Sequence, residues 1–204
     1  MITEKSTIRC ESVFNDEHTH RYLWKQVWNK DRPLAGVVML NPCQSDNLVM
    51  DTTTSLVVNN IARLEEYGGV AIVNLFSQLT TKLNFKWNSD EDLNGPENDH
   101  FIQKTADECA AVILAWGKGA ATNKRIAARA DQVAETLKPL QEKLFQISDG
   151  TRTGLHPLTP SIRSQWLLEP FRFPTKEELP QKEETQKEAT ETDVTAPDEA
   201  VEEV

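Results

Sequence analysis

The sequence predicts an α/β fold: a three-layer sandwich with a mainly parallel, four-stranded central sheet and an additional N-terminal β-hairpin. Two observations predict it. Short runs rich in apolar residues have the length of buried strands, at residues 36–40, 70–73, 111–115 and 144–147. The segments between these runs have helical spacing, which is typical of strand–helix–strand units and a parallel sheet.

The other elements have local signals. Residues 8–14 and 21–28 flank the polar turn 15–20, and this pattern predicts the hairpin. A helix is expected at residues 53–66, where the apolar side chains are close to helical spacing and Gly68-Gly69 follows. Asn94-Gly95-Pro96 is typical of a second helix start. A third, basic helix is expected at about residues 120–137, with Lys124, Arg125 and Arg129 exposed.

Composition predicts one folded domain and a tail. A chain of 204 residues can bury a sizeable core, so residues 1–174 are expected to form a single α/β domain. The formal net charge is −10, but residues 175–204 hold eleven acidic and three basic residues, a net charge of −8. With few large apolar residues, this end is expected to be a disordered acidic tail that serves solubility or competes with nucleic acid for a basic groove.

The cysteines and the hydropathy indicate a cytoplasmic protein. Cys10, Cys43 and Cys109 are odd in number and form no Cys-x-x-Cys pair, which argues against a disulfide framework and a structural zinc site. No stretch approaches the ~20 apolar residues that span a bilayer, and no signal-peptide pattern is found at the start. We therefore expect no membrane association; the sequence leaves the oligomeric state open.

The ends of the predicted strands indicate where a site lies. In parallel α/β sheets, ligands bind in the crevice beyond the carboxyl ends of the strands. Asn41-Pro42-Cys43, Asn74 and the loop that holds His156-Pro157 all follow predicted strands. Asn41-Pro42 could also be an ordinary turn. The Asn74 amide could pair with a base edge or with a neighbouring loop, and His156 could donate to an oxyanion or serve only the structure.

Other side chains near these breaks have alternative roles. Cys43 and His156 would form a nucleophile and base only if their loops approached each other. His18 and His20 could bind a metal, although no third ligand is near in the sequence. Asp51 and Thr53 could cap the helix predicted at 53–66 or face the site.

An ordered series of motifs across residues 8–160 resembles an uncharacterised domain-of-unknown-function family of bacteria and phages. The motifs are His20-Arg21-Tyr22-Leu23-Trp24, Leu40-Asn41-Pro42, Asp51-x-Thr53, Val73-Asn74-Leu75-Phe76, Gly95-Pro96-Glu97-Asn98-Asp99, Ala115-Trp116-Gly117 and His156-Pro157-Leu158. Cys43 stands where that family usually has Ser, and Thr159 stands where it usually has Tyr. A role for that hydroxyl or ring is therefore in doubt in this chain.

The order of the strand ends is also similar to the uracil-DNA glycosylase superfamily. There, an Asp-Pro or Asn-Pro loop positions the hydrolytic water, and an Asn at the end of the next strand reads the base. A His-Pro loop stabilises the departing base and inserts into DNA. The resemblance implies these roles for Asn41, Asn74 and His156, respectively.

Our leading hypothesis is a glycosylase-like enzyme that hydrolyses the N-glycosidic bond of a nucleobase or nucleotide, without metal or cofactor. Asn41 and His156 are the expected catalytic residues. The expected substrate-binding residues are Pro42, Cys43, Asp51, Thr53, Asn74, Phe76, Trp116, Gly117 and Arg163. The rival is a non-catalytic module that binds a nucleotide or a protein partner, and a third option is a Cys43-based hydrolase.

The expected ligand is a nucleobase, a nucleotide or modified nucleic acid. The charge weighs against polymeric DNA, because residues 1–174 carry a net charge of only −2 and DNA binding depends on Lys and Arg contacts to phosphates. A local basic patch could still supply such contacts, made of Lys118, Lys124, Arg125, Arg129, Arg152 and Arg163.

Overall fold

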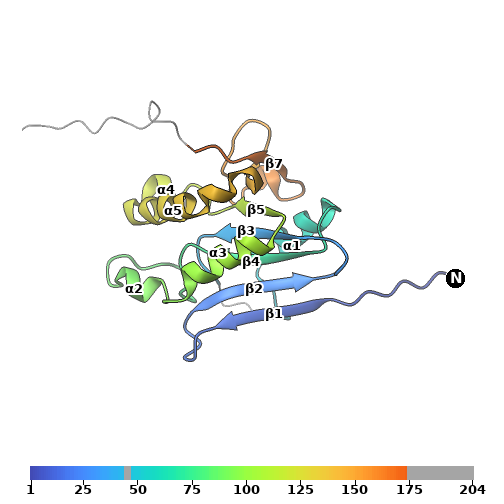
Figure 1. Ribbon diagram of the computed structural model, residues 1–204, viewed down its shortest axis with the longest axis horizontal. Helices are drawn as coiled ribbons and strands as arrows, with labels where there is room; N and C mark the ends of the chain where they lie inside the picture. Colours follow the sequence, from blue (N-terminus) through green and yellow to red (C-terminus); the bar gives the residue numbers. More distant parts are fainter. Residues whose placement is uncertain (44–46, 174–204) are drawn as a thin grey trace, which may run out of the picture. The chain divides into compact units, whose positions relative to one another are not determined.

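The computed structural model describes residues 1–43 and 47–173, and residues Met1–Phe171 form one compact unit. Its strands build one mixed sheet in the order β1-β2-β4-β3-β5-β6-β7 (Figure 1). The strands are β1 (Arg9–Phe14), β2 (Arg21–Val27), β3 (Leu34–Met39), β4 (Gly69–Asn74), β5 (Ala111–Leu114), β6 (Leu144–Ser148) and β7 (Leu167–Pro170). The tail predicted at residues 175–204 lies outside the described residues.

The four predicted core strands are the parallel centre of this sheet. β4, β3, β5 and β6 lie side by side and run in one direction. Their burial explains the sequence signal, since every residue of β4 and β5 is buried. The α/β class is therefore confirmed, but the prediction of a four-stranded sheet is wrong, because antiparallel strands extend both sides.

The predicted hairpin is part of the sheet rather than an addition to it. β2 pairs antiparallel with β4 and β1 pairs antiparallel with β2, so the hairpin covers an edge that β4 would otherwise expose. On the other side, β7 pairs antiparallel with β6. Strand β7 was not predicted. Its four residues, Leu-Leu-Glu-Pro, do not alternate between apolar and polar, and none of them is fully buried.

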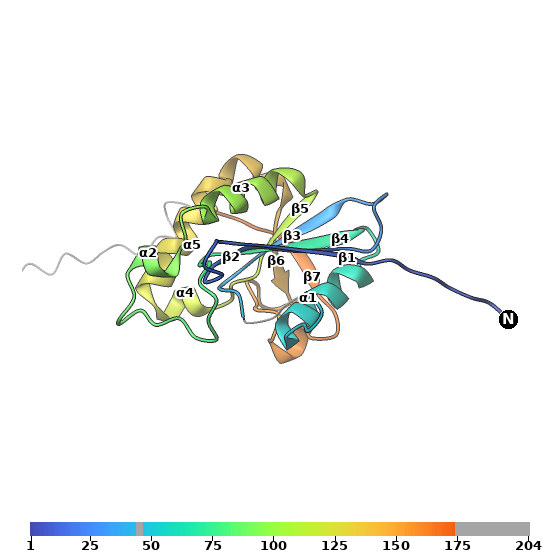
Figure 2. The same ribbon diagram turned by 90° about the horizontal axis from the view of Figure 1, so that it is seen from below.

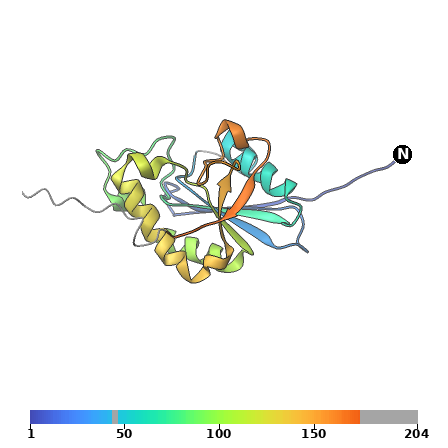
Figure 3. The same cartoon turned by 90° about the horizontal axis from the view of Figure 1, so that it is seen from above.

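The helices cover both faces of the sheet (Figures 2 and 3). Helix α1 (Thr52–Arg63) lies on one face, and α3 (Asn98–Glu108) and α5 (Lys124–Leu137) lie on the other. Right-handed crossovers explain this arrangement: the chain moves from β3 to β4 through α1, and then back past β3 to β5 through α3. The connections after β3 and β4 thus leave toward opposite faces, which creates a crevice at the carboxyl ends of these strands.

An apolar cluster fills the face that α1 covers. It includes Trp24 of β2, Val37 of β3 and Ile72 of β4, packed with Val57 and Ile61 of α1. All five side chains have at most 2% of their surface exposed. This packing fixes the first turn of α1 beside the carboxyl ends of the central strands.

The basic helix differs from its prediction. Short α4 (Gly119–Thr122) and α5 are separate, because the Asn123 side chain caps α5 by accepting from the backbone N–H groups of Arg125 and Ile126. Arg129 is only 8% exposed, so its predicted exposure is wrong. The connection between β4 and α3 contains a further short helix, α2 (Asp90–Leu93). Within residues 1–43 and 47–173, no helix is both long and apolar enough to span a membrane.

Candidate functional site

A cavity of about 170 Å³ lies at the carboxyl ends of β3 and β4, where the crossover argument places a crevice. It is lined by the ends of these strands, the start of β2, the first turn of α1 and the loop after β6. Its polar side chains come from distant parts of the chain: Arg21, Asn41, Cys43, Asp51, Thr53, Thr54, Asn74 and His156. The two amides and the imidazole that the sequence singled out therefore share one cavity.

Asn74 is a buried amide whose acceptor is unused. It is the last residue of β4, and only 2% of its surface is exposed. Its Oδ1 atom receives no hydrogen bond from any residue that the structure describes. An unsatisfied buried polar atom costs about 1–3 kcal/mol, so this carboxamide is suited to a ligand that carries a hydrogen-bond donor.

The backbone around Asn74 is held from the opposite face of the sheet. Asn98 of α3 donates to the carbonyl oxygens of Asn74 (2.9 Å) and Leu75 (3.3 Å). Arg129 of α5 donates to the same Leu75 carbonyl through Nε (2.8 Å) and is ion-paired with Asp99. These groups fix the end of β4, and so they determine where the Asn74 side chain enters the cavity.

Asn41 follows β3 and is fixed through its amide nitrogen. Nδ2 donates to the backbone carbonyls of Thr80 (2.7 Å) and Pro42 (3.3 Å). Because the nitrogen is engaged there, the amide oxygen is the atom that remains for a ligand or a water molecule. Pro42 itself is buried and does not line the cavity; its backbone carbonyl accepts from the amide of Asn41.

The hydrogen bonding of His156 indicates which of its ring nitrogens carries the proton. The backbone N–H of Leu158 donates to Nδ1 over 3.1 Å, so in the neutral ring the proton is on Nε2. Burial lowers the pKa of His156, which favours this neutral form. The ring therefore has an N–H donor, without a full positive charge, at the cavity wall.

Gly117 makes this position of His156 possible, although it does not line the cavity. Its φ angle is +71°, a backbone conformation that favours glycine. A Cβ atom at residue 117 would lie 2.6 Å from the Cβ of His156. Gly117 thus lets the loop after β5 pack closely against the loop that carries the imidazole.

Arg21 and Asp51 bring charge into the cavity. Arg21 is only 3% exposed, and burial lowers the pKa of its guanidinium, while the nearby Asp51 and Cys43 act in the opposite direction. Asp51 has both roles that the sequence left open: it caps α1 by accepting from the N–H and hydroxyl of Thr54, and it lines the cavity. Thr53 lines the cavity and is not the cap.

Cys43 is poorly suited to nucleophilic chemistry. Burial and the carboxylate of Asp51 raise the pKa of its thiol, and the positive charge of Arg21 offsets this only in part. A thiolate is the reactive form of cysteine, and reactive cysteines have lowered pKa values. Although Cys43 and His156 line one cavity, the electrostatics argue against the Cys43-based hydrolase.

Besides Pro42 and Gly117, three more predicted binding residues do not line this cavity. Phe76 follows the end of β4 and packs against Phe85, with ring centroids 5.6 Å apart. Trp116 is half-buried after β5 and is absent from the cavity wall. Arg163 is exposed and donates through Nε to the Leu158 carbonyl (3.1 Å), so it braces the loop that holds His156.

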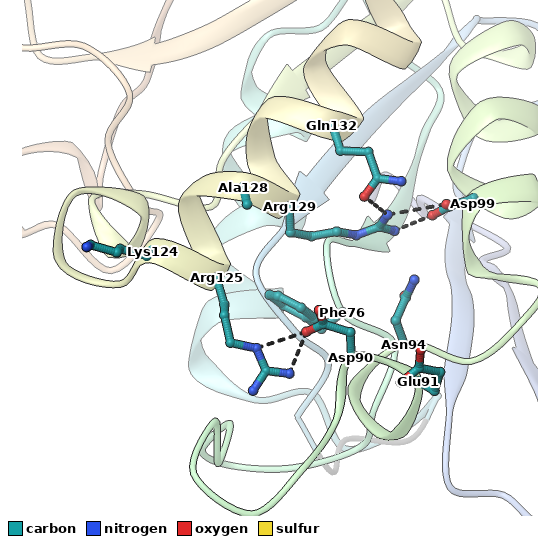
Figure 4. A pocket seen from close by; sticks show the side chains of 10 residues that line it. All are labelled: Phe76, Asp90, Glu91, Asn94, Asp99, Lys124, Arg125, Ala128, Arg129 and Gln132. Carbon is teal, nitrogen blue, oxygen red and sulfur yellow. Dashed lines mark hydrogen bonds and ion pairs between the residues drawn. The ribbon is translucent and has the colours of Figure 1, made fainter. Parts of the chain in front are cut away.

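Phe76 instead lines a larger cavity of about 400 Å³ between α2, α3 and α5 (Figure 4). Four charged side chains of this cavity form two ion pairs. Arg125 is ion-paired with Asp90, and Arg129 with Asp99. These pairs join α5 to α2 and α3.

The basic patch and the metal hypothesis lose support. Arg125, Arg129 and Arg152 all form ion pairs, which reduces the charge available for phosphates. His20 is hydrogen-bonded through Nδ1 to Ser77 (2.9 Å). Across the described ranges, no group of three or more His, Cys, Asp and Glu side chains could hold a metal ion.

Sequence reasoning missed Arg21 as a site residue. It belongs to a quoted motif, but at the start of a hairpin strand a polar side chain normally points to solvent. The signal that could have found it is the unusual composition of β2, where Arg21 precedes the apolar residues Tyr22, Leu23 and Trp24.

Comparison with known proteins gives a family. The model of the family described as "Protein of unknown function (DUF1643)" matches residues 21–158. No curated protein and no solved structure matches the chain. The matched range begins at Arg21 and includes Asn41, Asn74 and His156.

Proposed function

This chain belongs to the DUF1643 family, and from that premise we propose that it is a glycosylase-like enzyme that hydrolyses the N-glycosidic bond of a nucleobase or nucleotide. One observation carries the proposal: Asn41, Asn74 and His156, whose neutral ring holds its proton on Nε2, line a single small cavity. The distant similarity of the strand ends to uracil-DNA glycosylases suggests the same chemistry.

The size of the cavity supports a base as the occupant. Its volume of about 170 Å³ is below the roughly 300 Å³ at which pockets for drug-sized ligands begin. One heterocyclic ring fits such a space, whereas a whole nucleotide does not. The sugar of a nucleotide substrate would therefore lie at the cavity mouth, and a base in duplex DNA would have to leave the stack.

The reaction divides between the two catalytic residues. As the bond between C1′ and the base nitrogen breaks, its electron pair leaves with the base and the sugar becomes cation-like. The amide oxygen of Asn41 would orient a water molecule against C1′; an amide cannot take up a proton, so the water loses its proton to solvent after the new C–O bond forms. The departing base regains a proton from solvent.

His156 would stabilise the base as it departs. A neutral imidazole that donates from Nε2 suits an oxygen on which negative charge grows during bond breaking. A single preorganised donor of this kind contributes about 3 kcal/mol, or roughly a 100-fold change in rate.

Base release from single-stranded oligonucleotides that carry modified bases tests the proposal. We expect the full chain to release a free base, and Asn41→Ala and His156→Ala each to reduce the rate about 100-fold. The matched controls Asn59→Ala and His100→Ala alter exposed residues and should leave the rate unchanged. Release that survives both cavity variants would refute the proposal.

The second candidate is a binding module that uses the same cavity without breaking a bond. The ion pairing of the basic side chains favours it, because a catalyst acting on DNA needs cations for the phosphates. Saturable binding of a nucleobase without base release, under conditions where a positive-control glycosylase is active, would establish the binding module instead.

A further inference from the structure

Strand β1 leaves one edge of the sheet open (Figure 1). It is the first strand in the order of the sheet, and among the described residues it pairs with β2 alone. Its six residues contain no proline, and Arg9, Cys10 and Glu11 are exposed. The opposite edge differs, because β7 is shorter and ends in Pro170, which has no N–H group to donate. β1 is therefore the edge at which a further strand can pair.

The backbone groups on this free edge belong to Cys10 and Ser12. The N–H of Trp28 donates to the Gly68 carbonyl over 2.8 Å, so Trp28 points away from β1. Residues of a strand alternate in direction, and Gln26 therefore points away from β1 as well. Opposite residues of an antiparallel pair either face each other or both face away. Since Cys10 is opposite Gln26, the N–H and C=O groups of Cys10, and of Ser12 two residues on, point to the free edge.

The part of β1 that carries these groups is regular. The hairpin has a register shift after Val13, where Tyr22 is an extra residue of β2, but residues 9–12 lie on the other side of this bulge. The hydroxyl of Ser12 donates to Asn47 Oδ1 over 2.5 Å, and this contact uses no backbone group of the strand. The edge at residues 9–12 is thus a straight row of outward-pointing backbone donors and acceptors.

The charges of β1 match a second copy of the same strand. A symmetric dimer pairs the strand antiparallel with itself, so that each contact occurs twice about a two-fold axis. With Cys10 on that axis, Arg9 of each copy lies opposite Glu11 of the other. Registers centred on Arg9 or Glu11 bring two like charges together, which is destabilising, and a register centred on Ser12 pairs neither charge. Charge complementarity therefore selects the register with Cys10 on the axis.

The same register brings the opposite charges close together. The backbone groups of Arg9 and Glu11 point toward β2, so across the dimer these residues form a non-hydrogen-bonded pair, in which side chains lie nearest to each other. Lys25 of β2 lies opposite Glu11 within the hairpin. In the dimer Glu11 is therefore flanked by a positive side chain on each neighbouring strand.

We propose that β1 is the interface of a homodimer, in which two copies of the chain pair antiparallel with Cys10 on the two-fold axis. The seven-stranded sheets of the two copies then continue as one sheet across the dimer. No residue of β1 lines the cavity at the carboxyl ends of β3 and β4. The inference is therefore independent of the proposed function, and each copy keeps an open cavity.

Sedimentation velocity of the full chain under reducing conditions tests the proposal. One pair of strands buries less surface than a standard interface of about 1,600 Å², so we expect a reversible dimer with a Kd of about 1–100 µM. Arg9→Glu should weaken the dimer about tenfold, because like charges then meet twice. Adding Glu11→Arg to this variant exchanges the two charges and should restore the dimer. The matched control Arg63→Glu alters an exposed residue on the last turn of α1 and should change nothing.

A crosslinking measurement does not depend on the folding of the charge variants. Opposite residues of a hydrogen-bonded pair have Cα atoms about 5.5 Å apart, within the roughly 4.4–6.8 Å of disulfides, and Cys10 is exposed. Diamide, which oxidises two thiols to a disulfide, should therefore link the dimer through Cys10. Moving the thiol with Cys10→Ser and Ser12→Cys should abolish the link, because the Cα atoms of residue 12 would be about 14 Å apart.

Each contrary result overturns the proposal. A chain that sediments as a monomer over the whole concentration range has no such interface. A dimer that Arg9→Glu does not weaken, or that the exchanged charges do not restore, uses another surface. A thiol at residue 12 that links the dimer as fast as Cys10 excludes the register with Cys10 on the axis.

Discussion

Replacement of Gly117 by alanine tests whether the position of His156 depends on the loop after β5. The new Cβ atom would lie 2.6 Å from the Cβ of His156, and ordinary contact begins at 3.4 Å, so the two must separate by the difference of 0.8 Å. The site of substitution also has a φ angle of +71°, which an alanine rarely adopts. The substitution thus adds backbone strain and pushes on the imidazole.

The expected decrease in the free energy of unfolding has two parts. A non-glycine residue in the left-handed region costs about 1–2 kcal/mol. Overpacking against His156 adds about 1–3 kcal/mol, so the free energy of unfolding should fall by about 2–5 kcal/mol. A catalytic group displaced by nearly 1 Å can lose on the order of 100-fold in rate, so base release should fall with the stability.

Gly150→Ala is the matched control. Its φ angle of +85° imposes the same kind of strain, but a Cβ there would meet only Leu167 Cδ1 at an ordinary 3.7 Å. Urea unfolding should show a loss of about 1–2 kcal/mol for this control, with no change at the site. The ¹⁵N shifts of His156 should report the displaced ring in Gly117→Ala alone. Equal stability losses and unchanged His156 resonances in both variants would refute the reasoning.

Three further outcomes are expected. Arg129→Ala should lower the free energy of unfolding by about 2–3 kcal/mol, because it removes a buried charged donor. Arg125→Ala, which removes a more exposed ion pair, should lower it by about 1 kcal/mol. Urea unfolding measures both losses. Burial lowers the pKa of His156 in the folded state. The contribution of the neutral ring to the free energy of unfolding is therefore present above the unfolded pKa of 6.5 and is lost as pH falls through the folded pKa. His156→Gln should remove this pH dependence of the free energy of unfolding. At about pH 8, iodoacetamide should alkylate exposed Cys10 well before Cys43, whose thiol pKa is raised, as mass spectrometry can follow.

Each of these expectations has a clear contrary result. Equal losses in the two arginine variants would mean that the buried donor to Leu75 adds nothing to the fold. A pH dependence that His156→Gln leaves unchanged would place the titration elsewhere. Alkylation of Cys43 as fast as that of Cys10 would restore the thiol hydrolase.

Several features were predictable because their signals are local. Each central strand is a run of buried residues, and its predicted bounds agree with the structure to within two residues. The direction of parallel strands then puts their carboxyl ends at one edge, which is why Asn41, Asn74 and His156 line one cavity. Phe76 lines the other cavity, because its position after the end of β4 is set by packing against Phe85.

The sequence by itself determined the α/β class, the central strands and the edge of the sheet at which polar side chains gather, because short apolar runs show which segments are buried and in what order they follow along the chain. Only the tertiary structure decided that β2 and β7 extend the sheet, that Arg129 is buried and that Arg21 enters the cavity. Pairing partners and a one-residue bulge depend on contacts between segments far apart in the chain. A register shift of one residue reverses the face of the sheet on which a side chain lies, and the local sequence pattern does not reveal such a shift.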